Sequence, residues 1–365
     1  MKTKLIAKPK IVVVGSSNTD MIIKLDRIPK PGETILGGEF ATAAGGKGAN
    51  QAVAAARAGG EVTFVARVGQ DVFGEQAVAG FLQDGIEVEY VARDKTAPSG
   101  VALIFVAKDG ENSIAVAGGA NGRLSPADVK KAKGSIAGAS AVVMQLETPL
   151  ETVQAAAELA ARAEVPVILN PAPARVLPDK LLKLVSILTP NETEAELLTG
   201  IKVTDEATAA KAAEKLRARG VETVILTLGA RGAFVATASL KELVLGFEVK
   251  AVDTTAAGDV FNGALAVALG QGRGLLTAVR FANAAAAISV TRVGAQPSVP
   301  QRKEIEALLK RFEKRHSNQR SESTVGQLNP ACSRPSTRKL ELTSLASIAL
   351  KKSSSTKPNV RKIQK

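Results

Sequence analysis

The chain has 365 residues, of which 45% are hydrophobic and 23% charged, enough for one large α/β domain with an accessory piece or for two domains. No apolar run reaches the roughly 18 residues that a membrane-spanning helix needs, and the first ten residues lack the roughly 7–15 apolar residues of a signal-peptide core. We therefore expect a cytoplasmic protein with no membrane partner.

The formal net charge of +13 is unevenly distributed along the chain. Residues 316–365 carry ten Lys or Arg and two Asp or Glu, which is +8, so residues 1–315 carry 38 basic and 33 acidic side chains, or +5. The body is only mildly basic. Nucleic acid is therefore not an expected partner, except through the basic tail.

The single histidine, His316, and the single cysteine, Cys332, both lie near the C-terminus. Residues 1–315 therefore cannot supply a Ser-His-Asp triad, a cysteine nucleophile, a disulfide or the usual His/Cys ligands of zinc and iron. Chemistry in this part of the chain depends on carboxylates, lysines, hydroxyls, amides, backbone N–H groups and hard cations. Phosphoryl transfer is a common reaction that needs only those groups.

Short β-branched runs alternate with Ala-rich helical segments from residue 11 to about residue 313. In chain order, the sequence predicts strand 11–15, helix 47–57, strand 62–66, helix 74–82, strands 101–107 and 141–145, helix 150–162, strands 167–170 and 186–189, helices 191–198 and 206–219, strand 223–228, and helices 259–269, 275–291 and 300–312. Repeated strand–helix units predict an α/β fold with a mostly parallel sheet covered on both faces.

Two stretches, 20–42 and 98–118, interrupt this alternation with strand-like pieces joined by Gly, Pro and Asp-Gly turns. They predict hairpins that together form a small antiparallel sheet at one edge of the main domain. That sheet is either a lid over a ligand or an edge extension that serves as a dimer contact. Residues 314–365 are rich in Ser, Lys, Arg, Asn and Pro, which predicts a basic, disordered tail.

A Gly-rich segment, AAGGKGANQA at 43–52, opens the first predicted helix. It is not a P-loop, because Gly48 follows Lys47 where Ser or Thr should stand, and a dinucleotide fingerprint GxGxxG is absent after the first strand. Glycines at a helix start expose backbone N–H groups that suit an anion or a sugar hydroxyl. A tight turn without a ligand is the alternative interpretation.

A second cluster of small residues, VDTTAAGDVFNG at 252–263, is more informative. Its small residues let backbone N–H groups at a helix N-terminus approach a phosphate, and Asp259 lies in the first turn of that helix. The helix N-terminus favours the ionised carboxylate, which suits Asp259 to accept the proton of a hydroxyl that attacks phosphorus. An ordinary aspartate near a helix start is the alternative.

GGKGAN at 45–50 and DTTAAGD at 253–259 together resemble the two signatures of the ribokinase family of carbohydrate kinases. The resemblance spans about residues 10–313 and includes GANGRLSP at 119–126, MQLETPLE at 144–151 and TPNETEAELLTG at 189–200. It implies a three-layer sandwich with a mostly parallel central sheet and a small antiparallel β lid, in a kinase domain over 1–313 that forms a homodimer through the lid. The implied activity is ATP-dependent phosphorylation of the 5-hydroxyl of D-ribose, with Mg²⁺ accompanying ATP and K⁺ as activator.

The same resemblance implies roles for individual residues. The expected catalytic base is Asp259, in an anion hole formed by Ala256, Ala257 and Gly258. Sugar hydroxyls are expected at Asn18, Asp20, Gly46, Lys47, Asn50, Glu147 and Asp259. ATP is expected at Asn191, Thr227, Gly229, Gly232, Gly258 and Asn283, with Glu194 organising Mg²⁺ through water. The residues that match a K⁺ site, mostly through backbone carbonyls, are Asp253, Thr255, Ser289, Arg292, Gly294 and Ser298.

Kinases for 2-deoxyribose, fructose or a nucleoside such as adenosine share this machinery and remain open alternatives. Asn18, Asp20 and Glu147 favour a compact pentose rich in hydroxyls, because a buried polar site is left with unpaired groups when a hydroxyl is missing. A non-catalytic sugar or nucleotide sensor whose tail contacts nucleic acid is the alternative from another class. The intact Asp259 disfavours it, because a sensor needs no catalytic base.

Overall fold

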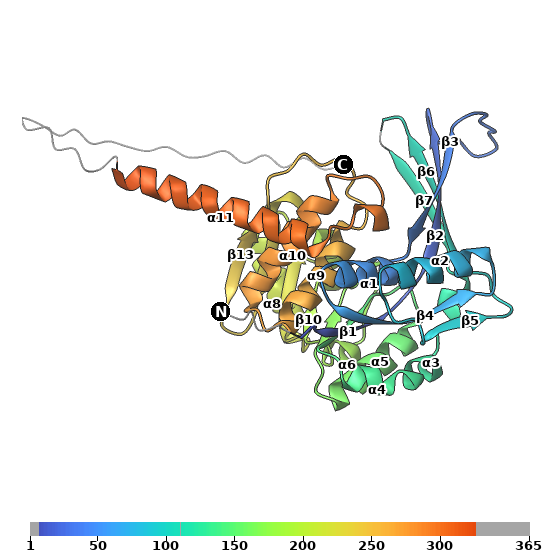
Figure 1. Ribbon diagram of the computed structural model, residues 1–365, viewed down its shortest axis with the longest axis horizontal. Coiled ribbons are helices and arrows are strands. Elements are labelled where there is room, and N and C mark those ends of the chain that lie inside the picture. Colours follow the sequence, from blue (N-terminus) through green and yellow to red (C-terminus); the bar gives the residue numbers. More distant parts are fainter. Residues whose placement is uncertain (1–6, 110, 326–365) are drawn as a thin grey trace, which may run out of the picture. The chain divides into compact units, whose positions relative to one another are not determined.

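The structure, a computed structural model, describes residues 7–109 and 111–325 (Figure 1). The chain divides into two units after Arg315, and the described residues of the first form one compact body. A nine-stranded sheet runs through the first unit in the order β13-β12-β11-β10-β9-β8-β1-β4-β5. Its strands, in that order, are Lys241–Leu245, Gly232–Ala236, Thr223–Thr227, Ile187–Leu188, Val167–Leu169, Ala141–Met144, Lys10–Val14, Glu61–Gly69 and Val91–Asp94.

The seven strands from β11 to β5 are parallel, and β12 and β13 continue the sheet in antiparallel pairing. The mostly parallel sheet expected from strand–helix alternation is therefore confirmed. Three strands were not predicted: β5, which follows a short loop, and the hairpin strands β12 and β13. The short turns around Gly232, and the polar residues of KELVL in β13, gave a weak strand signal.

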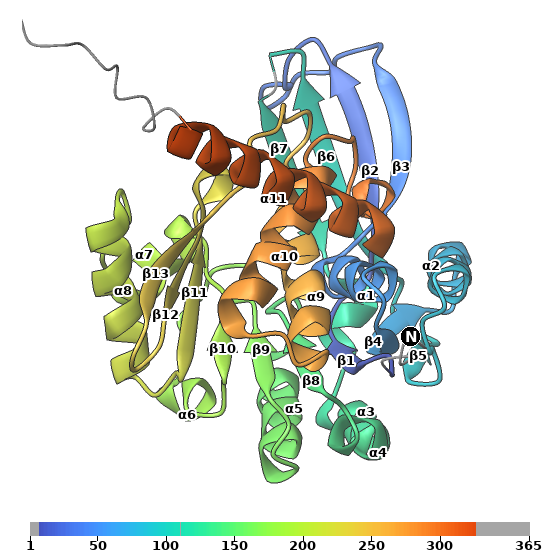
Figure 2. The ribbon, with the colours of Figure 1, turned by 60° about the vertical axis from the view of Figure 1, so that its left-hand side comes forward.

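Helices cover both faces of this sheet, because alternate residues of each buried strand point to opposite sides. In β1, Ile11 and Val13 belong to one hydrophobic cluster, and Val12 and Val14 to the other. Figure 2 shows the two helical layers. The first comprises α1 (Lys47–Arg57), α2 (Val72–Gln83), α9 (Ala257–Gly270), α10 (Leu275–Ser289) and the first part of α11 (Arg302–Val325). The second comprises α3 (Pro126–Lys131), α4 (Lys133–Ala137), α5 (Leu150–Arg162), α6 (Asp179–Leu182), α7 (Glu192–Thr199) and α8 (Glu206–Ala218).

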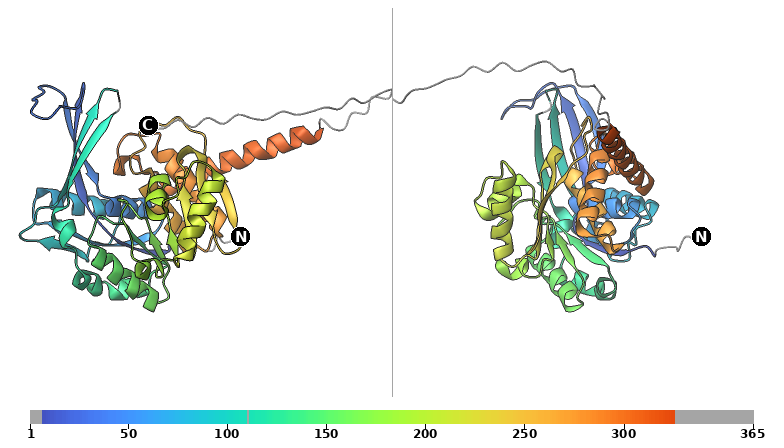
Figure 3. Two further views of the ribbon diagram at one scale, coloured as in Figure 1. Left: turned by 180° about the vertical axis from the view of Figure 1, so that it is seen from behind. Right: turned by 90° about the vertical axis from the view of Figure 1, so that its left-hand side faces the viewer.

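The predicted small sheet is present and projects from the main sheet (Figure 3). It has the order β3-β2-β6-β7, with strands Glu39–Gly45, Asn18–Leu25, Gly100–Ala107 and Asn112–Ala117. Its two hairpins are antiparallel as expected, whereas the central pair, β2 and β6, is parallel. They are parallel because both strands start at the main domain and run away from it in the same direction. Their first residues, Asn18 and Gly100, are paired. This sheet is called the lid below.

The helix expected at 300–312 extends further than predicted. Helix α11 continues to Val325, past the boundary at residue 313 where the sequence predicted a disordered tail. Residues 314–325 contain no Pro or Gly, so nothing in them interrupts a helix before Gly326. The rest of the predicted tail, 326–365, lies outside the described residues. Within the described part of the chain, no helix is long and apolar enough to cross a membrane.

Candidate active site

The predicted sugar-site residues meet at the edge where the parallel strands end. Asn18 follows β1, Glu147 follows β8, and the first turns of α1 and α9 bring Asn50 and Asp259 to the same edge. In parallel α/β sheets this carboxyl edge is where ligands bind. The residues that the motifs assign to a sugar site therefore lie at one edge of the sheet, as predicted.

Asp259 is buried, with 5% of its surface exposed, and both of its carboxylate oxygens accept hydrogen bonds from α1. Asn50 Nδ2 donates to Asp259 Oδ2 at 3.0 Å, and Gln51 Nε2 donates to Asp259 Oδ1 at 2.8 Å. Two amide NH₂ groups facing one carboxyl favour its ionised form, because an ionised carboxylate is purely an acceptor. Asp259 is thus oriented as a proton acceptor.

The electrostatics of Asp259 differ in part from the sequence-based expectation. Burial raises the pKa of Asp259, and the positive charge of Lys47 and the hydrogen bonds from Asn50 and Gln51 act in the opposite direction. The helix N-terminus predicts that ionisation is favoured. The cost of burying the carboxylate opposes it, and the sequence motif does not show that burial. A carboxylate whose pKa is raised is a stronger base once it is ionised.

Close packing of α1 against α9 makes these hydrogen bonds possible. A Cβ atom at Gly263 of α9 would lie 2.6 Å from the Ala54 Cβ and 2.6 Å from the Gln51 carbonyl oxygen of α1. Only glycine permits the two helices to approach so closely at this point. Gly263 thus holds the amide side chains of α1 within reach of Asp259.

Glu147 joins the start of α1 to the loop after β1. Its Oε2 accepts hydrogen bonds from the Ser16 hydroxyl at 2.5 Å and from the Lys47 backbone N–H at 2.9 Å. The carboxylate therefore takes the place of an N-cap side chain, which the N-cap residue Gly46 cannot supply. Its other oxygen makes no hydrogen bond within the described part of the chain, so it is available to a ligand hydroxyl.

Gly46 is required by the backbone geometry of this turn. Its φ angle is +88°, a region that favours glycine, and a Cβ there would lie 2.7 Å from the backbone nitrogen of Asn18. The Gly-rich segment therefore brings the start of α1 against the start of β2. The glycines thus form a tight turn that lies inside the candidate site, and a ligand at this turn remains a prediction.

A cluster of charges surrounds Lys47. Burial lowers the pKa of its ammonium group, but the carboxylates of Asp259, Glu147, Glu194 and Asp20 outweigh this and raise the pKa overall. Burial, together with the negative charges of Glu147 and Asp259, raises the pKa of Asp20 from 3.8 to about 6, although Lys47 lowers it. Lys47 is therefore the positive charge that allows several carboxylates to share this site.

The predicted anion hole lies at the N-terminus of α9. Ala256 is the N-cap residue and adopts a left-handed conformation, with φ +59° and ψ +11°, which costs a non-glycine residue about 1–2 kcal/mol. It leads into Ala257 and Gly258, whose backbone N–H groups begin the helix. Gly258 is exposed, and nothing lies within 4 Å of the position its Cβ would occupy. A phosphate can therefore approach the helix N-terminus here.

On the nucleotide side, Asn191 and Glu194 form the capping box of α7. The Glu194 side chain accepts from the Asn191 backbone N–H at 2.9 Å and from Asn191 Nδ2 at 3.0 Å. Burial raises the pKa of Glu194, while the Asn191 N–H and Lys47 lower it. Both Glu194 oxygens thus accept a hydrogen bond from Asn191, and the role of Glu194 in organising Mg²⁺ through water remains a prediction.

The described residues contain no group of three or more His, Cys, Asp or Glu side chains placed to hold a metal ion. Mg²⁺ commonly retains several waters and takes only one or two protein carboxylates, and Glu194 is a buried carboxylate on the nucleotide side.

The remaining predicted ATP residues have clear structural positions. Thr227 ends β11 and donates its backbone N–H to Pro190 at 2.9 Å, which joins the β11 end to the start of α7. Gly229 begins η2 (Gly229–Arg231) with φ +56°, and Gly232 has φ +104°. Asn283 of α10 is buried and donates to the carbonyls of Val244 at 3.0 Å and Leu245 at 3.3 Å. Their contacts with ATP remain predictions.

The predicted K⁺ residues come from two loops that the structure brings together. Asp253 accepts hydrogen bonds from the Thr255 N–H at 2.9 Å and, across the gap between loops, from the Gly294 N–H at 2.8 Å. These hydrogen bonds hold the pKa of Asp253 below its usual range, although partial burial acts against them.

The side chains of three predicted K⁺ residues do not take part in the contact between Asp253 and Gly294. The hydroxyls of Ser289 and Ser298 donate within their own turns, and Arg292 pairs with Glu304. Their proposed contribution through backbone carbonyls remains a prediction.

Sequence reasoning missed several polar residues that support the site. Gln51 contacts Asp259 directly, Gln145 Nε2 donates to Gln51 Oε1 at 2.6 Å, and Gln51 Nε2 also approaches Asn170 Oδ1 at 3.2 Å. Ser16 holds Glu147, and Asn121 bonds to the Ser17–Asn18 segment. Gln51 and Gln145 adjoin predicted residues in the sequence, but nothing local indicates which neighbours of a motif point inward.

We compared the chain with known protein families. Residues 8–302 match a family described as "pfkB family carbohydrate kinase". The chain belongs to the pfkB family of carbohydrate kinases. The resemblance stated from the sequence motifs is thereby confirmed.

Individual members of the family give closer comparisons. A ribokinase of Haemophilus influenzae is 49% identical over 294 residues, covering 80% of this chain and 96% of that protein. A deoxyribokinase of Salmonella typhi is 40% identical over 291 residues, covering 80% and 95%. The structure of an Arabidopsis thaliana ribokinase complexed with ribose and ATP is 36% identical, with a TM-score of 0.76, covering 83% of this chain and 99% of that chain. These matches confirm the three-layer pfkB fold.

Proposed function

We propose that this pfkB-family protein is a ribokinase, which transfers the γ-phosphoryl group of ATP to the 5-hydroxyl of D-ribose. The observation that carries the proposal is the buried Asp259 carboxylate, which lies at the N-terminus of α9 and faces the sugar-site side chains of α1 and the β8 loop. Ribokinases that resemble this chain over about four-fifths of its length support ribose as the sugar.

In the proposed mechanism, Asp259 accepts the proton of the 5-hydroxyl as that oxygen attacks the γ-phosphorus. The P–O bond to ADP breaks as the new P–O bond forms, and the proton remains on the carboxylate until the product leaves. Backbone N–H groups at Ala257 and Gly258, with the dipole of α9, stabilise the charge on the transferring phosphoryl group. The rigid pair Asn50 and Gln51 keeps the carboxylate aligned.

The remaining sugar-site residues orient the pentose. The free oxygen of Glu147 and the carboxylate of Asp20 accept hydrogen bonds from sugar hydroxyls, and Asn18 and Lys47 donate hydrogen bonds to sugar oxygens. The lid carries Asp20 on one of its faces. In register with it on that face are Ile22, Ala102 and Ile104, which can cover the sugar and exclude water.

The cofactors in this proposal are Mg²⁺ and K⁺. Glu194 and Asn191 would hold Mg²⁺ through water, and the ion would neutralise charge on the ATP phosphates. The loops joined by Asp253 and Gly294 would hold K⁺, which would stabilise the loop that leads into the anion hole. The link is short, because Asp253 precedes Ala256 by three residues.

We further propose a homodimer formed through the lid. The face of the lid opposite Asp20 carries Met21, Ile23, Phe40 and Leu103, and Phe40 and Leu103 are 64% and 47% exposed. A two-sided apolar sheet in water is unfavourable unless its outer face is covered. On this proposal the lid serves both as cover for the sugar and as dimer contact. A cytoplasmic location fits an enzyme that draws on ATP.

The test is ADP production with Mg-ATP across D-ribose, 2-deoxyribose, D-fructose and adenosine, each with K⁺ and with Na⁺ in its place. We expect ribose to have the highest kcat/KM and K⁺ to increase it. Preference for another sugar would keep the kinase mechanism and overturn the ribose assignment. No turnover with any of them, combined with ligand binding, would favour the sensor alternative.

A further inference from the structure

Asn121 lies at the base of the lid and has no role in the mechanism above. It belongs to η1 (Gly119–Arg123), directly after β7, and only 1% of its surface is exposed. Its side chain reaches the segment that carries the sugar-site residue Asn18. Oδ1 accepts from the Ser17 N–H at 2.8 Å, and Nδ2 donates to the Ser17 carbonyl at 3.0 Å and to Asn18 Oδ1 at 2.7 Å.

These contacts fix the orientation of both amides. The Ser17 N–H can only donate, so the Asn121 atom that faces it must be the oxygen. The Asn121 NH₂ group then faces the Ser17 carbonyl, which can only accept, and the same NH₂ group faces Asn18. The Asn18 atom that meets it must therefore be an acceptor, which is Oδ1. Asn18 Nδ2 is consequently turned away from Asn121, and it has no partner within the described part of the chain.

We propose that Asn121 is a positioning residue that sets the polarity of Asn18, so that Asn18 presents its NH₂ group, and not its carbonyl oxygen, to the sugar. This inference rests on the proposed sugar site. At that site Asp20 and Glu147 accept hydrogen bonds from sugar hydroxyls, whereas Asn18 donates a hydrogen bond to a sugar oxygen. The Asn18 NH₂ group thus adds a second donor to that of Lys47 in a site otherwise rich in acceptors, so more of the sugar oxygens find a partner for their lone pairs.

The lid is built around this hydrogen bond. A Cβ at Gly100, the first residue of β6, would lie 2.1 Å from Asn18 Oδ1 and 2.2 Å from Asn121 Nδ2, so β6 begins against the paired amides. Asn18 begins β2, and Asn121 follows β7. Strand β3 ends at Gly45, which pairs with Asn18, so all four lid strands start or end at this point, and the orientation of Asn18 depends on how the lid packs here.

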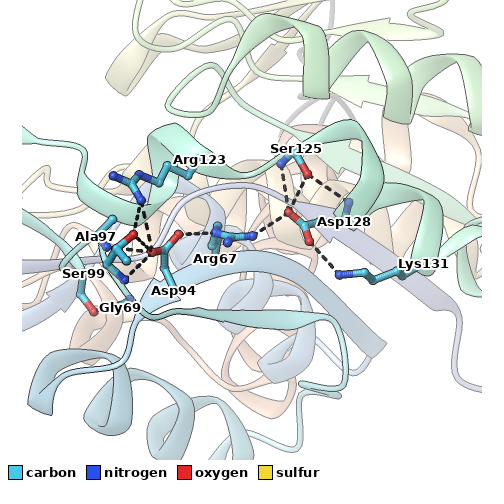
Figure 4. Close-up of polar contacts among 10 residues, drawn as sticks. Arg67, Gly69, Asp94, Ala97, Ser99, Arg123, Ser125, Asp128 and Lys131 are labelled. Carbon is cyan, nitrogen blue, oxygen red and sulfur yellow. Dashed lines mark hydrogen bonds and ion pairs between the residues drawn. The ribbon is translucent and has the colours of Figure 1, made fainter.

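An ion-pair network holds η1 in place (Figure 4). Arg67 of β4 bonds Asp94 Oδ2 at 2.7 Å and Asp128 Oδ2 at 3.0 Å, and so joins the end of β5 to the first turn of α3. Arg123, two residues after Asn121, lies 3.5 Å from Asp94 Oδ1. Arg123 thus ties η1 to the end of β5, which restrains the neighbouring Asn121 as a positioning residue requires.

The test is Asn121→Asp in the full chain, with Asn112→Asp at the exposed far end of β7 as the matched control. An aspartate at 121 still accepts from the Ser17 N–H but cannot donate, so Asn18 must turn its NH₂ group inward and its oxygen toward the sugar. We expect Kd for ribose, measured by calorimetry without ATP, to rise about tenfold or more. We expect KM for ATP, and kcat at saturating ribose, to stay within about threefold of the parent, and the control to match the parent.

A double-mutant cycle with Asn18→Ala separates positioning from general damage. If Asn121 acts through Asn18, then Asn121→Asp adds little once Asn18 is alanine. Additive losses, or equal losses of kcat and ATP affinity, would overturn the proposal. If wild-type protein prefers another sugar, the comparison is made with that sugar, so failure of the ribose assignment is distinguished from failure of this inference.

A second variant keeps the proposal testable if Asn121→Asp does not fold. Asn18→Asp retains an acceptor for Asn121 Nδ2, so the base of the lid stays bonded, but it removes the NH₂ group offered to the sugar. We expect a loss of ribose affinity as large as that of Asn18→Ala. Ribose affinity close to wild type in Asn18→Asp would show that Asn18 serves the sugar as an acceptor and would refute the proposed polarity.

Discussion

Gln51 Nε2 lies 2.8 Å from Asp259 Oδ1, and Gln51 Oε1 in turn accepts from Gln145 at 2.6 Å. The proposed base is thus held by a chain of amides that begins at the end of β8 and crosses α1. Because an ionised carboxylate can only accept, Gln51 must present its NH₂ group to Asp259, which leaves Gln51 Oε1 to accept from Gln145.

Replacing Gln51 should change the pH dependence of catalysis. Gln51→Met keeps the volume but removes a donor to the ionised carboxylate, so the pKa of Asp259, already raised by burial, should rise further. The acid limb of the kcat profile should move to higher pH. Steady-state kinetics across pH would measure this, with Gln154→Met on α5 as the control. An unmoved acid limb with reduced kcat would assign Gln51 a purely structural role.

Removing the proposed base should abolish most turnover. Asp259→Asn eliminates the proton acceptor, and we expect kcat to fall about 10²- to 10⁴-fold. Because both oxygens of Asp259 accept NH₂ groups, an asparagine also leaves one of these donors unpaired, which costs about 1–3 kcal/mol. Thermal unfolding and ribose binding should therefore accompany the kinetics. Near-wild-type turnover in a folded variant would rule out Asp259 as the base.

Asp20 should destabilise the free enzyme above pH 6. Its pKa rises from 3.8 in the unfolded chain to about 6 in the folded protein, so the folded state binds more protons between these values. The free energy of unfolding therefore falls as pH rises through that window, by at most about 3 kcal/mol. Asp20→Asn should stabilise the protein at pH 8 and change little at pH 4.

Denaturant titrations at the two pH values would test this, with the exposed Asp26→Asn in the lid as control. Equal effects of Asp20→Asn at both pH values would contradict the shift in pKa. The same variant should weaken ribose binding, because the asparagine side chain offers a single acceptor oxygen where the carboxylate offers two. Asp20→Asn should therefore raise the free energy of unfolding while it lowers the affinity for ribose. Such an exchange is typical of a binding site in which a charge is buried at a cost in stability.

Asp253 should control the response to K⁺. Asp253→Ala removes the acceptor of two backbone N–H groups, from Thr255 and Gly294, and separates the loops that the proposed cation site needs. We expect the K⁺ concentration for half-maximal activation to rise about tenfold, with ribose affinity little changed. Asp109→Ala at the lid tip is the control. An unchanged K⁺ response would exclude this location for the cation.

The sequence predicted the parallel sheet, most of its helices and the residues that gather at its carboxyl edge, because hydrophobic periodicity and Gly-rich motifs are local signals. It did not predict the parallel pairing of β2 with β6, which depends on segments far apart in the chain. Nor did it find Gln51 or Asn121, whose partners Asp259 and Asn18 come from other elements. The sequence also does not predict the full extent of α11, because the polar composition of residues 314–325 is typical of disorder.

The parallel pairing of β2 with β6 also bears on how the protein folds. Each lid hairpin is local, but β3 and a whole α1–β4–α2–β5 unit separate β2 from β6 in the sequence, so we expect the two hairpins to pair late, once that unit is in place. Since Asn18 and Asp20 both lie in β2, the sugar site is completed only in the last stages of folding. Native-state hydrogen exchange should accordingly find the lid opening at lower free energy than the central strands β1 and β8, so that a chain with an intact core can still lack a sugar site.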